Sequence, residues 1–219
     1  MATTTRSRTS SGSRTASRNG SPTRSRDGSS GSKGRLSPQP RLGQTGAELQ
    51  RFGSIRQLPI ALSADARTES CQLLNEILAD SMVLAALYKK SHWNAVGPTF
   101  YQLHLLFDKH YEEQVELVDA LAERVQMLGG ISVGDPRHAA ELTTIPRPPD
   151  GSEEVPVVLS RLLDAHETII EKVRDGIDKT EENKDWGSND LLMGDVLRTH
   201  EMQVWFLAEH IVEVPLVEA

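Results

Sequence analysis

Cysteine is nearly absent from this chain, which has one, Cys71, among 219 residues. No intrachain disulfide can form. Cys71 lies in an apolar helical segment, and we expect it to be a core residue. The N-terminus also lacks an apolar segment of the signal-peptide type, and no stretch reads as long and apolar enough to span a bilayer. These absences favour a cytoplasmic protein without a membrane partner.

Acidic and apolar residues are almost missing from residues 1–41, which are rich in Ser, Arg, Gly, Thr and Pro. This segment holds nine basic residues and one acid, Asp27, for a formal charge of +8. The other 178 residues hold 15 basic and 30 acidic residues, for a charge of −15, so the net charge of −7 hides two opposite parts. So few apolar side chains cannot offset the entropy lost on ordering, and the sequence predicts a disordered tail.

A flexible, arginine-rich arm suits DNA binding, because each contact with a phosphate releases counterions. The candidate DNA-binding residues are Arg6, Arg8, Arg14, Arg18, Arg24, Arg26, Lys33, Arg35 and Arg41. Three other interpretations stay open. The arm could keep an acidic particle soluble, dock on acidic surfaces of neighbouring chains, or act as an organelle transit peptide, which has this Ser- and Arg-rich composition.

Apolar residues recur at three- and four-residue spacings through the rest of the chain, which predicts helices. The expected long helices are 64–93, 98–128, 153–180 and 190–211, with a short helix near 136–142 and a polar turn at 181–190. A linker over 42–62 precedes this helical domain, 63–213, and 214–219 form a short tail. Four long helices, no convincing strand and one long connection predict an all-α four-helix bundle, with the short helix in a central crossover as in ferritin-like folds.

The helix expected at 98–128 carries a stripe of residues that can bind metals. His104 and Asp108 are four residues apart, as are Asp119 and Glu123, so each pair shares a helix face. At 100° per residue, all four fall within about 100° of one another. A solvated acidic face is the alternative, but the stripe contains no Lys or Arg partner and its neighbours are apolar. These neighbours are Leu103, Phe107, Val115, Leu117 and Val118.

The stripe is too long for one metal ion in one chain. Asp108 and Asp119 are eleven residues apart, or about 16 Å along the axis, whereas carboxylate–metal bonds are about 2 Å. Two antiparallel copies of the helix, related by a two-fold axis near Glu113 and Gln114, would place the His104 pair of one chain opposite the Asp119 pair of the other. One such contact creates two equivalent sites.

A further histidine precedes the break between the first two helices. His92 could fold back to join His104 and Asp108, so that each site would have two imidazoles and three carboxylates. Such a mixed set of nitrogen and oxygen donors suits Fe(II) and also accepts zinc or manganese.

The residues around this stripe resemble the Dps family of ferritin-like proteins. The matching positions are His92-Trp93-Asn94, Gly97, Phe100, Leu103-His104, Phe107-Asp108, Asp119, Ala122-Glu123-Arg124 and Leu128-Gly129-Gly130. The segment WFLAEHI at 205–211 is similar to that family's last helix. The resemblance covers roughly residues 60–212 and leaves the first 41 residues outside it.

The resemblance implies a hollow dodecamer built from two-fold dimers, which oxidises Fe(II), typically with hydrogen peroxide, and stores the ferric product. It implies ferroxidase centres between two-fold-related subunits, two at each dimer contact. One subunit would supply the catalytic metal ligands His92, His104 and Asp108, and its mate would supply Asp119 and Glu123. Trp93 resembles an aromatic residue near the centre, and packing explains it equally well. Many members bind DNA through basic termini and others do not, which leaves association with the nucleoid open.

Acidic residues around the end of the helix expected at 153–180 are candidates for lining iron pores, with a solvated helix end as the alternative. They are Asp175, Asp178, Glu181, Glu182, Asp185 and Asp190. The other histidines have no clear partners in the sequence and are expected to be surface or packing residues. They are His110, His138, His166, His200 and His210.

Two other functions remain open. A ferritin or bacterioferritin with a di-iron centre inside one subunit needs Glu-x-x-His pairs, which the segments EILAD, EMQVW and DAHE do not supply. A DNA-compacting nucleoid protein, with a structural or zinc-occupied metal site, would bind DNA and leave Fe(II) unoxidised.

Overall fold

The computed structural model describes residues 39–213, and this part of the chain is helical with no strand. It divides into a unit that ends at Thr45 and a bundle unit that begins at Gly46. The helices of the bundle are α1 (Ala64–Asn94), α2 (Phe100–Met127), α3 (Pro136–Leu142), α4 (Val155–Glu182), α5 (Trp186–Leu191), the π-helical η1 (Leu192–Leu197) and α6 (Arg198–Ala208).

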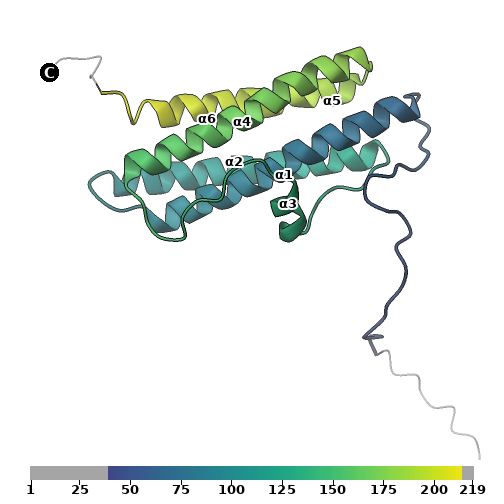
Figure 1. Cartoon of the computed structure of the whole chain (residues 1–219), viewed down its shortest axis with the longest axis horizontal. Helices are drawn as coiled ribbons and strands as arrows, with labels where there is room; N and C mark the ends of the chain where they lie inside the picture. The colour runs from purple at the N-terminus through teal and green to yellow at the C-terminus, as the bar shows by residue number, and fades with distance from the viewer. Residues whose placement is uncertain (1–38, 214–219) are drawn as a thin grey trace, which may run out of the picture. The chain divides into compact units, whose positions relative to one another are not determined.

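Four long helical rods make up the bundle (Figure 1). The α1 and α2 helices pack side by side, α4 packs on α1 and α6, and the short α3 packs on α1 within the connection from α2 to α4. The α5, η1 and α6 segments follow one another without a break and form the fourth rod. The predicted all-α, ferritin-like bundle with a short helix in its central crossover is confirmed.

Local capping explains where the helices begin. Ser63 precedes α1, and its hydroxyl oxygen accepts a hydrogen bond from the Ala66 amide at 3.2 Å. Asp135 caps α3 in the same way, and Pro136 occupies its first position. The α2 helix begins at Phe100, two residues later than predicted, because Gly97 has φ of +100° and turns the chain before the helix starts.

The fourth rod begins earlier than predicted. The polar segment 181–190 was expected to be a turn, but only residues 183–185 lie outside a helix, and α5 begins at Trp186. The Asp185 carboxylate accepts a hydrogen bond from the Ser188 amide at 3.2 Å, which satisfies a free amide at the start of α5. The chain turns at Lys184, whose backbone adopts the left-handed conformation with φ of +57°.

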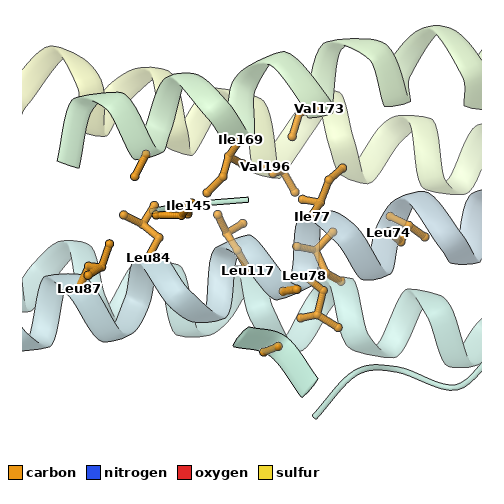
Figure 2. Close-up of a cluster of buried hydrophobic side chains, with 14 of the residues drawn as sticks. Leu74, Ile77, Leu78, Leu84, Leu87, Leu117, Ile145, Ile169, Val173 and Val196 are labelled. Carbon is orange, nitrogen blue, oxygen red and sulfur yellow. The ribbon is translucent and has the colours of Figure 1, made fainter. Parts of the chain in front are cut away.

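Aliphatic side chains from all four rods fill the interior (Figure 2). Those labelled in Figure 2 include Leu74, Ile77, Leu84, Leu117, Ile169, Val173 and Val196. Ile145, from the crossover segment, is also buried in this cluster. Cys71 is buried too, which confirms it as a core residue.

The α1 helix meets the length and composition expected of a membrane span, contrary to the prediction that no segment would. However, 72% of its most apolar window is buried inside the bundle. Burial in the core therefore explains its apolar character without a bilayer.

The segment before α1 is fastened to the end of α2, and we call residues 50–57 the strap. The carbonyl oxygen of Gly129 accepts hydrogen bonds from the Gln50 side chain and the Arg56 amide, both at 2.9 Å. The buried Arg67 donates to the carbonyls of Arg56, at 2.8 Å, and Leu128, at 3.0 Å. Gly129 has φ of +89°, and a Cβ there would lie 2.6 Å from the Arg56 oxygen, so only glycine fits.

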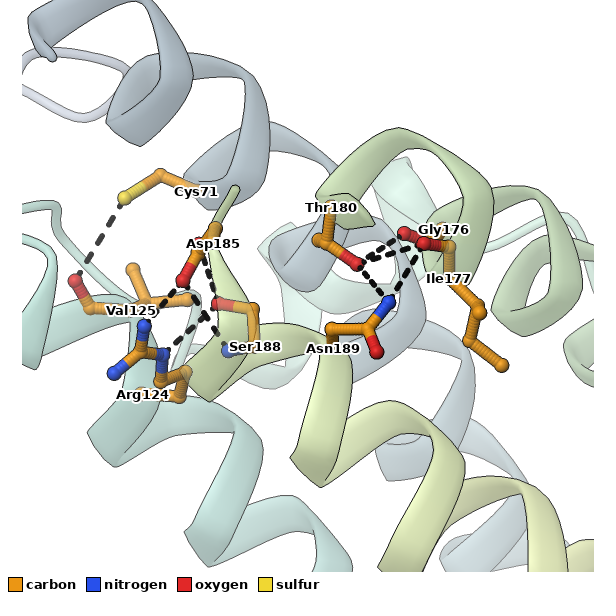
Figure 3. A network of polar contacts seen from close by, with 9 residues as sticks. All are labelled: Cys71, Arg124, Val125, Gly176, Ile177, Thr180, Asp185, Ser188 and Asn189. Atoms are coloured by element: carbon orange, nitrogen blue, oxygen red, sulfur yellow. Dashed lines mark hydrogen bonds and ion pairs between the residues drawn. The ribbon is translucent and has the colours of Figure 1, made fainter. Parts of the chain in front are cut away.

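A buried ion pair links the end of α2 to the start of α5 (Figure 3). Arg124 Nη2 lies 2.5 Å from Asp185 Oδ1, and Arg124 Nε donates to Ser188 Oγ at 2.9 Å. The Asp185 side chain is only 1% exposed. Burial raises the pKa of Asp185, but the hydrogen bond from Ser188 and the charge of Arg124 more than offset this and leave it lowered. This is a correction: Asp185 was a pore candidate, but its carboxylate is buried in the subunit and cannot line a pore.

We expect Arg124→Ala to destabilise the protein by about 3 kcal/mol, because it leaves the Asp185 carboxylate buried without its cation. The control is Arg174→Ala, which breaks the exposed pair with Glu201 and should cost less than about 1 kcal/mol. Urea unfolding followed by circular dichroism, at one protein concentration, measures both changes. Because the pKa of Asp185 is lowered by folding, the difference between wild type and Arg124→Ala should be full at neutral pH. It should shrink as acid protonates Asp185. Equal effects of the two substitutions would contradict this role.

Candidate metal centre

Two histidines meet where α1 ends and α2 begins. His92 lies in the last turn of α1, and the short turn through Gly97 brings the first turns of α2 back beside it. The rings of His92 and His104 are stacked, with their centroids 3.7 Å apart and their planes at 21°. The predicted return of His92 to the His104 end of the stripe therefore occurs within one chain.

Hydrogen bonds fix which ring nitrogens carry protons. His92 Nδ1 lies 2.8 Å from the carbonyl oxygen of His104, and His104 Nδ1 lies 3.0 Å from that of His92. Because a carbonyl oxygen only accepts, both Nδ1 atoms carry a hydrogen, so Nε2 is the ring atom through which each neutral imidazole could bind a metal. A neutral imidazole oriented by a carbonyl is the form in which histidine binds metals, so the two residues fit a metal site.

Asp108 lies one turn beyond His104 and is held by Lys89 of α1. Its Oδ1 atom is ion-paired with the Lys89 ammonium and lies 3.9 Å from His92 Nδ1. The hydrogen bond from Lys89 lowers the pKa of Asp108, and the nearby His92 and His104 act in the same direction. The prediction that the stripe has no basic partner is therefore corrected in part, since Asp108 has a basic partner on the neighbouring helix α1.

Asp119 and Glu123 lie farther along α2, and both are exposed. Within residues 39–213, no three His, Cys, Asp or Glu side chains gather closely enough to hold a metal ion. The stripe therefore consists of two separate parts in one chain. We call His92, His104 and Asp108 the histidine half-site, and Asp119 with Glu123 the carboxylate half-site.

The surface of α2 between the two half-sites exposes apolar side chains. Leu105 is 51% exposed and Val115 is 43% exposed, while Tyr101 near the start of α2 is 68% exposed. Asp119 borders an open groove whose wall includes Met82 and Val115. Leu103, Phe107 and Leu117, which were predicted to flank the stripe, instead point into the core and are buried.

The other predicted residues are spread over the surface. Trp93 is 70% exposed beside His92. Asp175, Asp178, Glu181 and Glu182 are exposed towards the C-terminal end of α4. Asp190, named with them, is exposed on α5. Of the nine candidate DNA-binding residues, only Arg41 falls within the described residues.

Lys89 is a residue of this region that the sequence pattern did not predict. It lies three residues before His92 on α1, and its spacing places it near that histidine, but nothing in the local pattern pairs it with Asp108. Its ammonium contacts Oδ1 of Asp108, so it would compete with a metal cation for that oxygen.

Comparison with known proteins gives a consistent result. The family model described as "Ferritin-like domain" matches residues 71–217. A protein encoded in the bpoA2 5′ region of Kitasatospora aureofaciens is 68% identical over 140 residues, which cover 64% of this chain and 93% of that protein. The solved structure of DpsC from Streptomyces coelicolor matches with a TM-score of 0.77 and 59% identity, covering 78% of this chain and all of that one. A nutrient stress-induced DNA-binding protein of a Synechococcus strain is 32% identical and covers 70% and 87% of the two chains.

Lys89→Met removes the ammonium that competes for Asp108, so we expect a divalent cation to bind more tightly. The gain in affinity should be only about twofold to fivefold, because exposed ion pairs of this kind contribute little. Calorimetric titration with Zn²⁺, which is not oxidised, measures the change. Lys90→Met is the matched control, because Lys90 donates to the Gly151 carbonyl and not to a carboxylate. Equal affinities for the two variants would show that Lys89 does not compete with the metal.

Proposed function

The chain belongs to the Dps family of ferritin-like proteins, and on this basis we propose that it is a ferroxidase. It oxidises Fe(II), with hydrogen peroxide as the expected oxidant, at centres shared by two subunits, and stores the ferric product in a hollow shell. The observation that carries the proposal is the preformed His92–His104 pair, whose Nε2 atoms are free while the remaining acidic ligands lie too far away in the same chain.

The histidine half-site supports iron binding by its chemistry. Two neutral imidazoles and the Asp108 carboxylate form a mixed set of nitrogen and oxygen donors, which suits Fe(II). Zinc and manganese are bound by similar sets, so either could occupy the site in place of iron.

The carboxylate half-site supports sharing between subunits. Asp119 is eleven residues from Asp108, or about 16 Å at the helical rise, so Asp119 and Glu123 complete a site only from a second chain. The exposed Leu105 and Val115 between the half-sites provide apolar area for a contact with that chain. A two-fold axis across this face joins each histidine half-site to the partner's carboxylate half-site, and one interface then makes two centres.

The chemistry of the completed centre follows from its charge. Three carboxylates stabilise Fe(III) over Fe(II) and thereby favour oxidation, while His92 and His104 bind without adding charge. Two Fe(II) ions supply the two electrons that convert hydrogen peroxide into two waters, with two protons taken from solvent. Because the electrons are delivered as a pair, hydroxyl radical is not released and nearby DNA is protected.

The assembly expected for this activity is a dodecamer of two-fold dimers, within the cytoplasm or on the nucleoid. The exposed acids Asp175, Asp178, Glu181, Glu182 and Asp190 are the remaining candidates for lining the pores through which iron enters. Trp93 lies beside the centre, where it either packs against the partner or shields the site.

The basic arm, residues 1–41, is proposed to bind DNA. A related chain is named a DNA-binding protein, and the +8 charge of this arm contrasts with −15 for the rest of the chain. An acidic particle repels DNA, and twelve arms acting on one duplex would overcome that repulsion by avidity.

Mixing two inactive variants tests whether centres are shared. His104→Ala and Asp119→Ala should each oxidise Fe(II) much more slowly than wild type, because every centre lacks a ligand. In co-expressed mixtures, half of the dimers should be mixed, and each mixed dimer holds one intact and one doubly damaged centre. About a quarter of the wild-type oxidation rate should therefore return. A mixture as inactive as its components would place the centre within one subunit, and wild-type rates in both single variants would refute the ligand assignment.

Deleting residues 1–41 should abolish DNA binding and leave Fe(II) oxidation intact, because the proposed ligands begin at His92. Binding by the full chain should be independent of sequence and should fall steeply with salt, since counterion release drives it. A gel-shift series over salt compares the two proteins, with iron oxidation measured on the same samples. If the full chain fails to shift DNA at low salt, the arm has another role. DNA binding without iron oxidation would instead favour the compacting protein with a structural or zinc-occupied site.

A further inference from the structure

A connected set of polar side chains, none of them a proposed metal ligand, runs through the interior of the bundle. We call it the interior polar chain, and its members are Tyr88, His110, Gln114, His166, His200 and Gln203. They come from α1, α2, α4 and α6, and all six are buried. The three histidines were expected to be surface or packing residues, and they are packing residues joined by hydrogen bonds.

Tyr88 lies between two imidazoles. Its hydroxyl oxygen is 2.5 Å from His166 Nε2 and 3.2 Å from His110 Nδ1. The other ring nitrogen of His166, Nδ1, lies 2.8 Å from Nδ1 of His200. A phenol in contact with two buried imidazoles therefore forms the centre of the chain.

The other end of the interior polar chain reaches a carboxylate. Gln114 Nε2 lies 3.5 Å from His200 Nε2 and donates to Gln203 Oε1 at 3.0 Å. Gln203 Nε2 donates to Glu113 Oε2 at 2.8 Å. Glu113 is half-buried and also pairs with Lys109.

The carboxylate sets the direction of every hydrogen bond in the chain. It only accepts, so the amide nitrogen of Gln203 faces it and the Gln203 oxygen faces Gln114. The Gln114 amide nitrogen then faces His200, whose Nε2 must accept and whose Nδ1 must carry the hydrogen. His166 consequently accepts at Nδ1 and donates from Nε2 to Tyr88. The Tyr88 hydroxyl is left to donate to His110 Nδ1.

Burial keeps this interior uncharged. It lowers the pKa of His200 to about 3 and that of His166 well below its ordinary value, and it raises the pKa of Tyr88 well above 10. Tyr88 is therefore a protonated phenol at neutral pH. Its proton already points at a base, so the proton can leave when the ring loses an electron.

Tyr88 lies close to the histidine half-site. It precedes His92 by four residues on α1, which is one turn and about 6 Å of rise. Its ring centroid is 6.2 Å from that of Phe107, and Phe107 is adjacent to Asp108. An electron would therefore cross about one helical turn of packed side chains to reach the centre.

We propose that Tyr88 is a built-in electron donor, which supplies the second electron for hydrogen peroxide when a centre holds a single Fe(II). The proposal rests on the proposed ferroxidase function. The Lys89 ammonium is paired with Asp108 and would compete there with a metal cation, which favours a centre that holds one Fe(II) rather than two. One Fe(II) alone gives peroxide one electron, and the product would include hydroxyl radical.

The proposed step balances. Fe(II) and Tyr88 each lose one electron, the phenolic proton moves to His110 Nδ1, and one hydrogen peroxide takes both electrons and two protons from solvent to give two waters. A second Fe(II) then reduces the tyrosyl radical, and His110 returns the proton to the phenolate oxygen. The net reaction is the oxidation of two Fe(II) ions by one peroxide, with Tyr88 regenerated.

The other two tyrosines of the chain have different surroundings. Tyr101 is 68% exposed, and the ring of Tyr111 has the Lys89 ammonium 4.5 Å from its centre, which opposes removal of an electron. Among the described residues, neither hydroxyl contacts an imidazole. Tyr101→Phe/Tyr111→Phe is therefore a matched control that leaves Tyr88 as the only tyrosine.

The experiment loads the full-length protein with one Fe(II) per centre without oxygen, adds one equivalent of hydrogen peroxide, and freezes the sample for electron paramagnetic resonance. We expect a tyrosyl signal in the wild type and in Tyr101→Phe/Tyr111→Phe, and its loss in Tyr88→Phe. Ring-deuterated tyrosine should narrow the signal, which separates it from a tryptophan radical at Trp93. Spin-trapped hydroxyl radical should rise severalfold in Tyr88→Phe over the double variant.

The outcomes separate this inference from the proposed function. If the wild type with two Fe(II) per centre fails to oxidise iron with peroxide, the ferroxidase proposal fails. If iron is oxidised but the double variant shows no tyrosyl signal, or a signal unaffected by deuterated tyrosine, Tyr88 is not the donor. The double variant keeps the test valid even if Tyr88→Phe does not fold.

Discussion

The fixed rise of an α-helix, about 1.5 Å per residue, is the constraint on which the proposed activity depends. It separates Asp108 from Asp119 by roughly 16 Å, a distance that no side chain can close, and so divides the ligands of α2 into two half-sites. The stacked His92 and His104 rings orient one half-site inside a single chain. In the proposed centre, a second chain supplies the other half-site across an apolar face. A monomer would then lack part of the ligand set, and activity would require assembly.

Much of the fold follows from local sequence. The short helix expected near 136–142 is present as α3, where Asp135 caps the first turn and Pro136 occupies the first position. The start of α5 was missed because its cap, Asp185, lies in an acid-rich segment that reads as a turn. Of the candidate site, the sequence yields the stripe and the grouping of His92 with His104. It could not yield the Lys89–Asp108 pair or the interior polar chain, since Tyr88 and His166 are 78 residues apart and meet only by packing.

The interior polar chain changes how the bundle core is understood. Bundles of this architecture commonly place metal ligands inside, projecting from facing helices. Here the interior holds neutral imidazoles, two amides and a phenol, whose hydrogen bonds all take their direction from one carboxylate, Glu113. Such a directed network favours one arrangement of the packing over others, although His110 Nε2 and Gln114 Oε1 have no hydrogen-bond partner among the described residues.

The strap has a mechanical consequence. A DNA duplex that pulls on an arm would load the bundle first at Gly129, through the bonds from Gln50 and Arg56. Gly129 lies just beyond the C-terminal end of α2, about 42 Å of helix from its start at Phe100. Glu123 of the carboxylate half-site lies in the last turns of the same helix. The strap and the carboxylate half-site therefore share one end of α2, so a change that loosens the strap at Gly129 would also loosen the helix end that holds Glu123.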